Sequence, residues 1–184
     1  MPGLKGSVLA GCKLTVAYEG TRCAGWQMQA VPSGICPPEI RGGLEAAVGA
    51  IVGYRVPLHG AGRTDAGVHA EAQVCHFDVP ENREGVDWRR ALNVRLPVDI
   101  RVLKAETAVQ GFHSRKSARR KRYCYSLWRD GRMAVPGVKA FVWGCPPLNF
   151  GCVGRAAAHL TGKRDCGSFR NSGADTTDSV RTLY

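Results

Sequence analysis

The chain has 184 residues, enough for one ordinary domain or two small ones, and 44% of them are hydrophobic, which supports a core without disulfide bonds. Its formal net charge is +11, and the excess is concentrated: residues 83–132 carry 14 Lys and Arg against 5 Asp and Glu. No apolar stretch of about 18 residues occurs, so we expect no membrane span. Because a positive field attracts polyanions, nucleic acid is the leading class of partner; a solubilising basic face is the alternative.

The first part of the chain predicts strands around one helix. Residues 13–18 are β-branched and aromatic, which favours a strand, and a loop containing Gly25-Trp26-Gln27 follows. A helix over residues 38–53 is indicated by apolar residues at near-helical spacing, namely Ile40, Leu44, Val48 and Ile51. Shorter elements are predicted further on: strands at 55–59, 72–79 and 98–103, and a helix at 88–93 capped by Asp87.

The second part begins with a basic run, residues 115–122, that leads into a predicted strand at 123–128 with alternate aromatic residues on one face. Residues 130–149 are rich in Gly and Pro and are typical of a linker. A helix is predicted at 150–160, and residues 179–184 resemble the opening of a strand. The pattern predicts an α+β fold of two strand–helix–strand halves, with domains at 1–110 and 111–184.

Eight cysteines raise the possibility of disulfides or zinc. No Cys-x-x-Cys pair and no zinc-finger spacing occurs, so we expect no metal site. Several cysteines lie in apolar runs, such as Cys124 between two tyrosines. Buried, reduced thiols in a cytoplasmic protein are therefore the expectation.

The glycine-rich stretch at residues 60–67 holds the strongest candidate site. Asp65 lies between Gly62 and Gly67, and glycines let the backbone approach a ligand closely. Arg63 is two residues away and can keep the carboxylate ionised. A fixed carboxylate can act as a nucleophile, as a base, or as a stabiliser of positive charge on a sugar. The alternative is an ordinary turn whose Asp makes local hydrogen bonds.

Two other classes of site share parts of this stretch. Asp65-Ala66-Gly67 is similar to the Asp-Thr-Gly of aspartic proteases, which need a second such carboxylate, and the sequence has none. His69-Ala70-Glu71 has the His-x-Glu form of zinc deaminases, whose metal also needs a downstream Pro-Cys-x-x-Cys. Residues 145–148 do not supply that motif, so both classes are discarded.

Gly62–Ala70 also resembles the catalytic motif of the TruA family of transfer-RNA pseudouridine synthases. The resemblance continues in the same order along nearly all of residues 13–184. Further matching segments are Val16–Thr21, Gly25-Trp26-Gln27 with Gln29, Gly43–Ala47, Gln73–Phe77, Phe112–Arg115 with Ser117-Ala118, Arg122–Tyr125, Ala157 with His159-Leu160, Gly162, Asp165, Ser168-Phe169 and Val180–Thr182.

The resemblance implies a pseudouridine synthase fold, with flanking helices on an antiparallel or mixed sheet, and a cofactor-free isomerisation of uridine in folded RNA. Asp65 would be the essential carboxylate. Arg63 would hold it and help extrude the target nucleotide, because the reacting atoms are inaccessible in a base stack. Tyr123 would stack on the extruded uracil and assist proton removal; a core aromatic of the predicted strand is the alternative for this residue.

The resemblance also implies RNA contacts. Trp26 and Gln27 match positions that line the RNA cleft, although Trp26 could equally be a core anchor. The basic run would bind phosphates through Arg115, Arg119, Arg120, Lys121 and Arg122. The implied partner is the anticodon stem–loop of transfer RNA, at positions 38–40, bound by a cytoplasmic homodimer.

Two departures from the family pattern stand out. Lys116 occupies a position where the family usually has Phe. Family members also continue for several elements beyond the equivalent of Val180–Thr182, including an apolar helix with a basic residue that pairs with the catalytic Asp. The second half is therefore expected to be incomplete. This leaves a second hypothesis, an RNA-binding module of the same fold with little or no catalysis.

Overall fold

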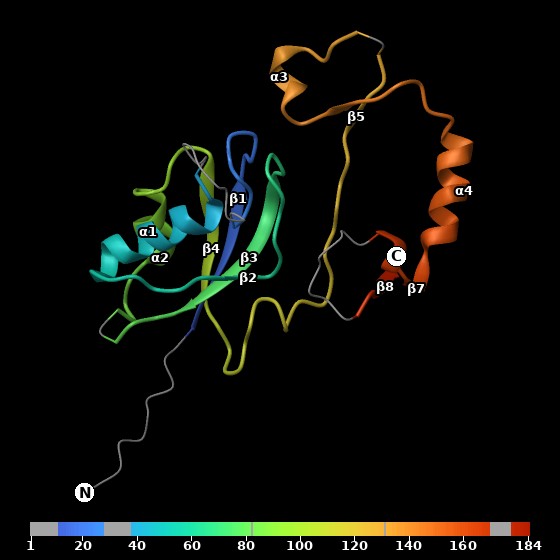
Figure 1. Cartoon of the computed structure of the whole chain (residues 1–184). Helices are drawn as coiled ribbons and strands as arrows, with labels where there is room; N and C mark the ends of the chain where they lie inside the picture. The colour runs from blue at the N-terminus through green and yellow to red at the C-terminus, as the bar shows by residue number, and fades with distance from the viewer. Residues whose placement is uncertain (1–10, 28–37, 82, 131, 170–177) are drawn as a thin grey trace, which may run out of the picture. The chain divides into compact units, whose positions relative to one another are not determined.

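Residues 11–27, 38–81, 83–130, 132–169 and 178–184 are described by the computed structural model. The chain divides into two units, Met1–Tyr123 and Cys124–Tyr184 (Figure 1). Gln29 and Cys36, which entered the sequence predictions, lie outside the described residues.

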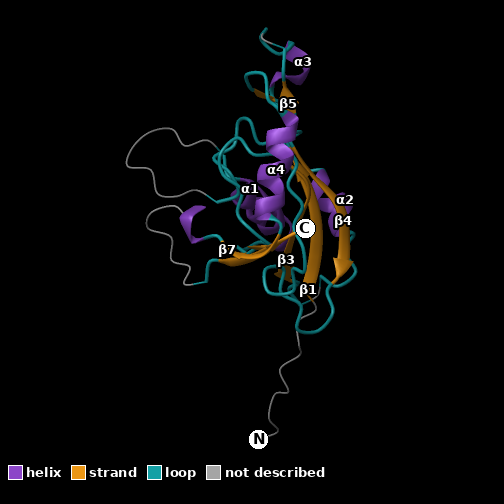
Figure 2. Ribbon diagram, turned by 90° about the vertical axis from the view of Figure 1, so that its right-hand side faces the viewer, coloured by secondary structure: helices purple, strands orange, loops and turns teal. Residues whose placement is uncertain are grey.

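The first unit is built on a four-stranded antiparallel sheet with the strand order β2-β3-β1-β4. Figure 2 shows its three long strands side by side. The strand bounds are Gly11–Tyr18 for β1, His59–Gly60 for β2, Ala70–Asp78 for β3 and Ile100–Thr107 for β4. The strand β1 lies in the interior of the sheet, with β3 on one side and β4 on the other.

Two helices, α1 (Ile40–Val52) and α2 (Trp88–Asn93), contribute to one hydrophobic core with the sheet. Alternate residues of β1 are buried, because successive side chains of a strand point to opposite faces. Leu14 and Val16 are therefore fully buried, whereas Lys13 and Thr15, which alternate with them, are half-buried on the other face. Phe77 of β3 meets the ring of Trp88 edge to face, with centroids 4.9 Å apart.

The helix ends follow the local sequence. Gly53 ends α1 in the left-handed conformation, with φ of 92°, and its N–H donates to the Gly49 carbonyl at 2.8 Å. The Asp87 carboxylate begins α2 by accepting from the Arg90 backbone N–H at 3.1 Å, as the sequence predicted.

The second unit contains two small sheets and two helices in its described residues. Its elements are β5 (Leu127–Trp128), α3 (Pro136–Lys139), β6 (Trp143–Gly144), α4 (Phe150–Leu160), β7 (Gly162–Asp165), a 3₁₀ turn (Gly167–Phe169) and β8 (Val180–Leu183). β5 pairs with β6 in parallel and β7 with β8 antiparallel. Asn149 caps α4 by accepting from the Cys152 N–H at 3.2 Å, yet every residue of that helix is exposed.

The α+β class with an antiparallel sheet is confirmed, and the helices predicted at 38–53, 88–93 and 150–160 are present. The division into two strand–helix–strand halves stays a prediction. Among the described residues, none of the helices is long and apolar enough to cross a membrane.

The predicted strand at 123–128 is wrong over most of its length, since only Leu127 and Trp128 lie in a strand. Tyr123 and Tyr125 alternate as in a strand but are exposed, and this part of the chain carries no strand pairing. Alternation predicts a strand only where a second backbone satisfies its N–H and C=O groups. The prediction that Cys124 is buried is wrong for the same reason, and its thiol is exposed.

Two further corrections concern short elements. The strand predicted at 55–59 is reduced to His59–Gly60. The preceding Leu58 N–H donates to the Glu45 carboxylate of α1 and not to a neighbouring strand. The linker predicted at 130–149 contains α3 and β6. The seven described cysteines are free thiols, of which Cys12, Cys23, Cys75 and Cys145 are buried as expected and Cys152 is exposed.

The core makes a quantitative prediction. Phe77→Ala should lower the free energy of unfolding by about 3–5 kcal/mol, because it removes a fully buried ring and leaves a cavity between sheet and helices. Val98→Ala, at an exposed position, should change it by less than about 0.5 kcal/mol. Urea unfolding of both variants measures the difference, and a similar small loss in both would contradict the core assignment.

Candidate active site

The loop with Asp65 joins two paired strands, β2 and β3. His59 faces His76 and Gly60 faces Cys75 in the antiparallel register. The pairing continues one residue into the loop, where the Ala61 N–H donates to the Val74 carbonyl at 2.8 Å. The Gln73 side chain donates to the Gly62 carbonyl at 2.7 Å. Both ends of the loop are therefore fixed by the sheet.

A second loop, residues 19–27 after β1, is hydrogen-bonded to the first. The Trp26 N–H donates to the Thr64 carbonyl at 2.9 Å, and the Gly67 N–H donates to the Cys23 carbonyl at 3.3 Å. The Tyr18 hydroxyl lies 2.8 Å from the Thr64 hydroxyl. These bonds hold the backbone on both sides of Asp65.

Three glycines make this close approach possible. Gly25 has φ of +91°, and a Cβ atom there would lie 2.5 Å from the Thr64 carbonyl oxygen. A Cβ at Gly20 would overlap the Val68 backbone, and one at Gly60 would lie 2.6 Å from the Trp26 ring. Larger residues at these positions would separate the two loops.

His69 contributes to the same attachment. Its Nδ1 accepts the Gly20 N–H at 3.2 Å and lies 3.6 Å from a carboxylate oxygen of Glu19. The Thr21 hydroxyl and N–H, together with His69, hold the pKa of Glu19 below its usual range. His69 therefore binds the backbone of the opposite loop.

Asp65 itself is exposed, and its backbone carbonyl accepts the Val68 N–H at 3.2 Å, which closes a turn. Arg63 is also exposed. Within the described part of the chain, the ion pairs do not include one between these two side chains. The role predicted for Arg63 in holding Asp65 stays a prediction. The carboxylate is presented to solvent from an anchored backbone, where a ligand can reach it.

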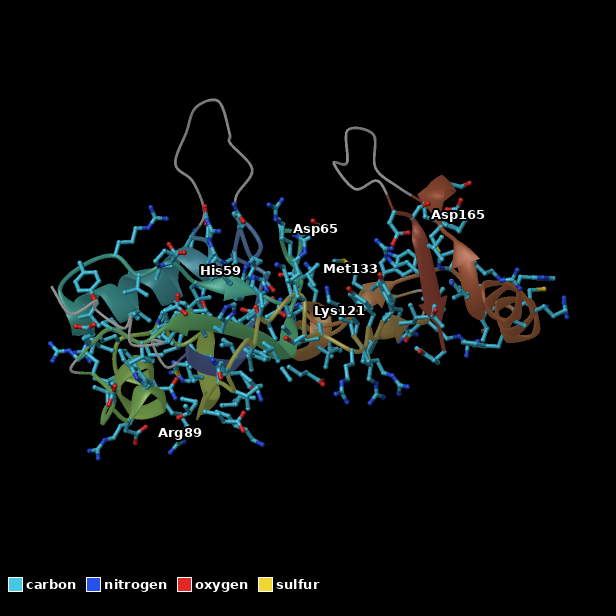
Figure 3. All side chains as sticks on the ribbon, turned by 90° about the horizontal axis from the view of Figure 1, so that it is seen from below. His59, Asp65, Arg89, Lys121, Met133 and Asp165 are labelled. Carbon is cyan, nitrogen blue, oxygen red and sulfur yellow. The ribbon has the colours of Figure 1, made fainter. Side chains whose placement is uncertain are left out.

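The basic segment, residues 115–122, approaches this loop. All its residues are exposed, including the five predicted RNA-binding residues Arg115, Arg119, Arg120, Lys121 and Arg122. The Lys121 ammonium group lies so close to Gly62 that a Cβ at that glycine would overlap it. Figure 3 shows Lys121 on the same side of the first unit as Asp65. Cationic charge and the carboxylate therefore lie in one region.

The remaining predicted residues differ in exposure. Tyr123 is 72% exposed, and the role predicted for its ring stays a prediction. Trp26 is only 2% exposed and lies 6.3 Å, centroid to centroid, from the Tyr18 ring. Trp26 is therefore the core anchor, and its side chain cannot line an RNA cleft. Gln27 is half-buried.

Sequence reasoning missed a cluster of three histidines around Ser114. The rings of His59, His76 and His113 lie with centroids 4.9–5.6 Å apart. Burial lowers the pKa of His76, and the neighbouring His59 and His113 lower it further. No group of three or more His, Cys, Asp or Glu residues in the described ranges is arranged to hold a metal ion. His59 and His76 lie far from His113 in the sequence, so no local pattern signals this cluster.

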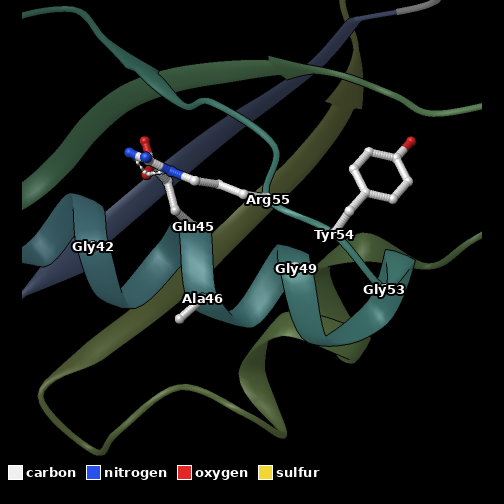
Figure 4. A pocket seen from close by; sticks show the side chains of 7 residues that line it. All are labelled: Gly42, Glu45, Ala46, Gly49, Gly53, Tyr54 and Arg55. Atoms are coloured by element: carbon white, nitrogen blue, oxygen red, sulfur yellow. Dashed lines mark hydrogen bonds and ion pairs between the residues drawn. The ribbon is translucent and has the colours of Figure 1, made fainter.

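Glu45 of α1 was also missed as a structural residue. Its buried carboxylate accepts from the Leu58 N–H at 3.1 Å and from the Arg55 guanidinium at 3.0 and 3.2 Å. Figure 4 shows this pair at the edge of an open hollow of about 470 Å³ along α1. The residues that line the hollow are Gly42, Glu45, Ala46, Gly49, Gly53, Tyr54 and Arg55, none of them from the Asp65 loop.

Buried thiols are poor candidates for the chemistry. Burial raises the pKa of Cys12 to about 12 and that of Cys75 further still, so both remain protonated at neutral pH. The exposed carboxylate of Asp65 is the stronger candidate for covalent or electrostatic catalysis.

Comparison with known proteins identifies the relatives of this chain. A family model described as tRNA pseudouridine synthase matches residues 14–115. Proteins named tRNA pseudouridine synthase A are similar over most of the chain: 46% identical over 180 residues in Oleidesulfovibrio alaskensis, 44% over 176 residues in Nitratidesulfovibrio vulgaris strain Hildenborough, and 40% over 172 residues in Neisseria gonorrhoeae strain FA 1090.

The chain belongs to the tRNA pseudouridine synthase family. The three alignments cover 96%, 96% and 93% of this chain, but only 65%, 59% and 63% of the respective relatives. The chain thus spans about three fifths to two thirds of the length of these proteins.

The contact between the two loops can be tested with a matched pair of glycine variants. Gly53 has nearly the same φ as Gly25 but no atom within 4 Å of a built Cβ. Gly53→Ala should therefore lose about 1–2 kcal/mol of stability from backbone strain alone. Gly25→Ala should lose more and should also displace the Asp65 loop.

Urea unfolding and the rate of tryptic cleavage after Arg63 report the two effects. We expect faster cleavage in Gly25→Ala than in Gly53→Ala, because the loop is no longer held at Thr64. Equal stability and equal cleavage in the two variants would show that the loops do not depend on each other.

Proposed function

We propose that this protein isomerises uridine to pseudouridine in transfer RNA. The observation that carries the proposal is an exposed carboxylate, Asp65, on a loop hydrogen-bonded from both sides and approached by the basic segment. Membership of the family and the names of the relatives support the same activity. The region has both elements that the reaction needs, a group for the glycosidic chemistry and a surface for a polyanion.

The proposed reaction breaks the bond between uracil N1 and the ribose, turns the base, and forms a bond from the ribose to uracil C5. The C5 proton is lost and N1 gains a proton, so the reaction is balanced without an oxidant, a reductant or a cofactor. Asp65 is the essential carboxylate, which adds either to the base or at the sugar. Its exposure supports direct access to an extruded nucleotide.

Arg63 and Tyr123 complete the proposed site. Arg63 helps to extrude the target nucleotide, which must leave the stack before its atoms become accessible. Tyr123 stacks on the extruded uracil and assists removal of the C5 proton. The exposure of both side chains supports these roles, because neither is committed to the core.

The basic segment is proposed to bind the RNA backbone. Its five cations, Arg115, Arg119, Arg120, Lys121 and Arg122, are exposed. Gln27, in the segment that supports Asp65, is a further candidate contact. Structured RNA is read mainly through its backbone and shape, with single bases drawn into pockets.

The finer parts of the proposal follow from the family resemblance. The substrate is the anticodon stem–loop, with uridines at positions 38–40 as targets, and the working form is a homodimer in the cytoplasm. The same resemblance implies that the reaction needs no cofactor.

A direct test incubates the chain with anticodon stem–loop RNA and maps pseudouridine. Asp65→Asn and Asp65→Ala should lower the rate by more than about 10³-fold, because each removes the reacting carboxylate. RNA affinity should stay within about threefold. Glu71→Gln, a nearby exposed carboxylate outside the loop, serves as the control and should keep the wild-type rate.

The alternative hypothesis predicts a different result. If wild type and Asp65→Ala are equally inert while both bind RNA, these residues form an RNA-binding module without catalysis.

The electrostatic part of the proposal has its own test. Replacing Arg119, Arg120 and Lys121 by Ala should reduce the slope of log affinity against log salt by about 2–3. Each phosphate contact releases counterions from the RNA on binding, so a variant with fewer contacts releases fewer of them. The control replaces three other exposed cations, Arg89, Arg90 and Arg95, of which Arg89 lies on the opposite side of the first unit from Asp65 (Figure 3). Equal changes of slope in both triple variants would contradict a localised phosphate site.

A further inference from the structure

Ser114 is a buried residue at the start of an exposed segment. Its side chain and backbone are 2% exposed, whereas residues 115–122 after it are all exposed. A serine that is buried in this way needs hydrogen-bond partners, and those partners show what it is attached to.

All of the partners lie on the hairpin that carries the Asp65 loop. The Ser114 hydroxyl donates to the His59 carbonyl at 2.7 Å and lies 3.0 Å from His76 Nδ1. The Ser114 N–H points to the same Nδ1 at 3.3 Å. His59 on β2 and His76 on β3 are cross-strand partners, so Ser114 binds both strands at one register position.

Aromatic rings close over this attachment. Phe112 meets His76 edge to face at 5.7 Å, and the His113 ring lies 4.9 Å from that of His76. Two backbone N–H groups, those of Arg115 and Lys116, are directed at His113 Nδ1. The turn at 112–116 is therefore held as a unit against the sheet.

The same segment reaches the hairpin again near its tip. Lys121, seven residues beyond Ser114, lies against Gly62 at the beginning of the Asp65 loop. The cations between these two points must follow a course fixed at both ends. Their positions relative to Asp65 thus depend on where Ser114 is attached.

The charge state of the cluster suits this attachment. A neutral His76 can accept the Ser114 N–H at Nδ1, and its lowered pKa keeps the ring neutral at neutral pH. Two charged groups near it neutralise each other: Lys13, its cross-strand partner on β1, forms an ion pair with Glu106 of β4 at 3.1 Å. Asp78, two residues further on β3, acts in the opposite direction and raises the pKa of His76, but burial has the larger effect.

We propose that Ser114 is a positioning residue for RNA: through His59 and His76 it sets where the basic segment lies relative to Asp65. It does not touch the reacting atoms. This inference rests on the proposed function, and it assigns a role in RNA binding to a residue for which the sequence suggested none.

The test is a double-mutant cycle on RNA affinity in the inactive Asp65→Ala background. Ser114→Ala should weaken binding of anticodon stem–loop RNA by about tenfold, in proportion to the lost hydrogen bonds. Lys121→Ala should weaken binding clearly in the presence of Ser114 but much less after Ser114→Ala, because Lys121 is then no longer held in place.

Ser117→Ala is the matched control. Ser117 is exposed in the same segment, and its hydroxyl accepts a local hydrogen bond, from the N–H of His113 at 3.1 Å. It should change RNA affinity by less than about twofold, and the effect of Lys121→Ala should persist in its presence. A purely structural role of Ser114 would lower thermal stability without coupling to Lys121.

The outcomes separate the two proposals. If the Asp65→Ala protein binds RNA and the free-energy effects of Ser114→Ala and Lys121→Ala on binding simply add, positioning by Ser114 is overturned while the proposed function stands. If the Asp65→Ala protein and the wild type do not bind RNA, the proposed function and the positioning role of Ser114 both fail. Should Ser114→Ala not fold, Ser114→Cys replaces it in the same cycle, since a thiol fills similar space but is a weaker donor.

Discussion

The backbone contact between residues 19–27 and the Asp65 loop is the constraint on which the site depends. Two turns that follow different strands meet so closely that Gly20 and Gly25 have no room for a side chain. The hydrogen bonds from Trp26 to Thr64 and from Gly67 to Cys23 then hold an exposed carboxylate in place. The loop is held by hydrogen bonds of its backbone, so the exposed Asp65 side chain remains accessible to a substrate.

This arrangement separates support from chemistry. The sheet, α1 and α2 bury the apolar residues and position the hairpin β2–β3, while the groups proposed for catalysis and RNA binding remain at the surface. The basic segment has no strand pairing of its own over residues 115–122. Its position comes from side chains instead, from Ser114 at the base of the hairpin and Lys121 near Gly62. A polyanion would meet cations whose course is set by the same hairpin that presents Asp65.

Several features were accessible from sequence because they rest on local rules. Apolar spacing predicted α1, and Asp87 predicted the cap of α2. The motif around Asp65 and its resemblance predicted the family that the comparisons confirm. Non-local features were less accessible. Alternation at Tyr123 and Tyr125 predicted a strand that has no partner, and the sequence left Trp26 open between the RNA cleft and the core, where its ring lies close to Gly60.

The sequence by itself determined the type of most elements and the family, and it pointed to Asp65 as the candidate residue, because each follows from residues close together in the chain or from an ordered motif. Only the tertiary structure decided which side chains support that residue. Ser114 and His76 are 38 residues apart, Tyr18 and Thr64 are 46 apart, and Ser114 and the His59 carbonyl are 55 apart. Their contacts exist because β3 pairs antiparallel with β2 on one side and with β1 on the other, which brings segments far apart in the sequence together, and no local pattern records that pairing.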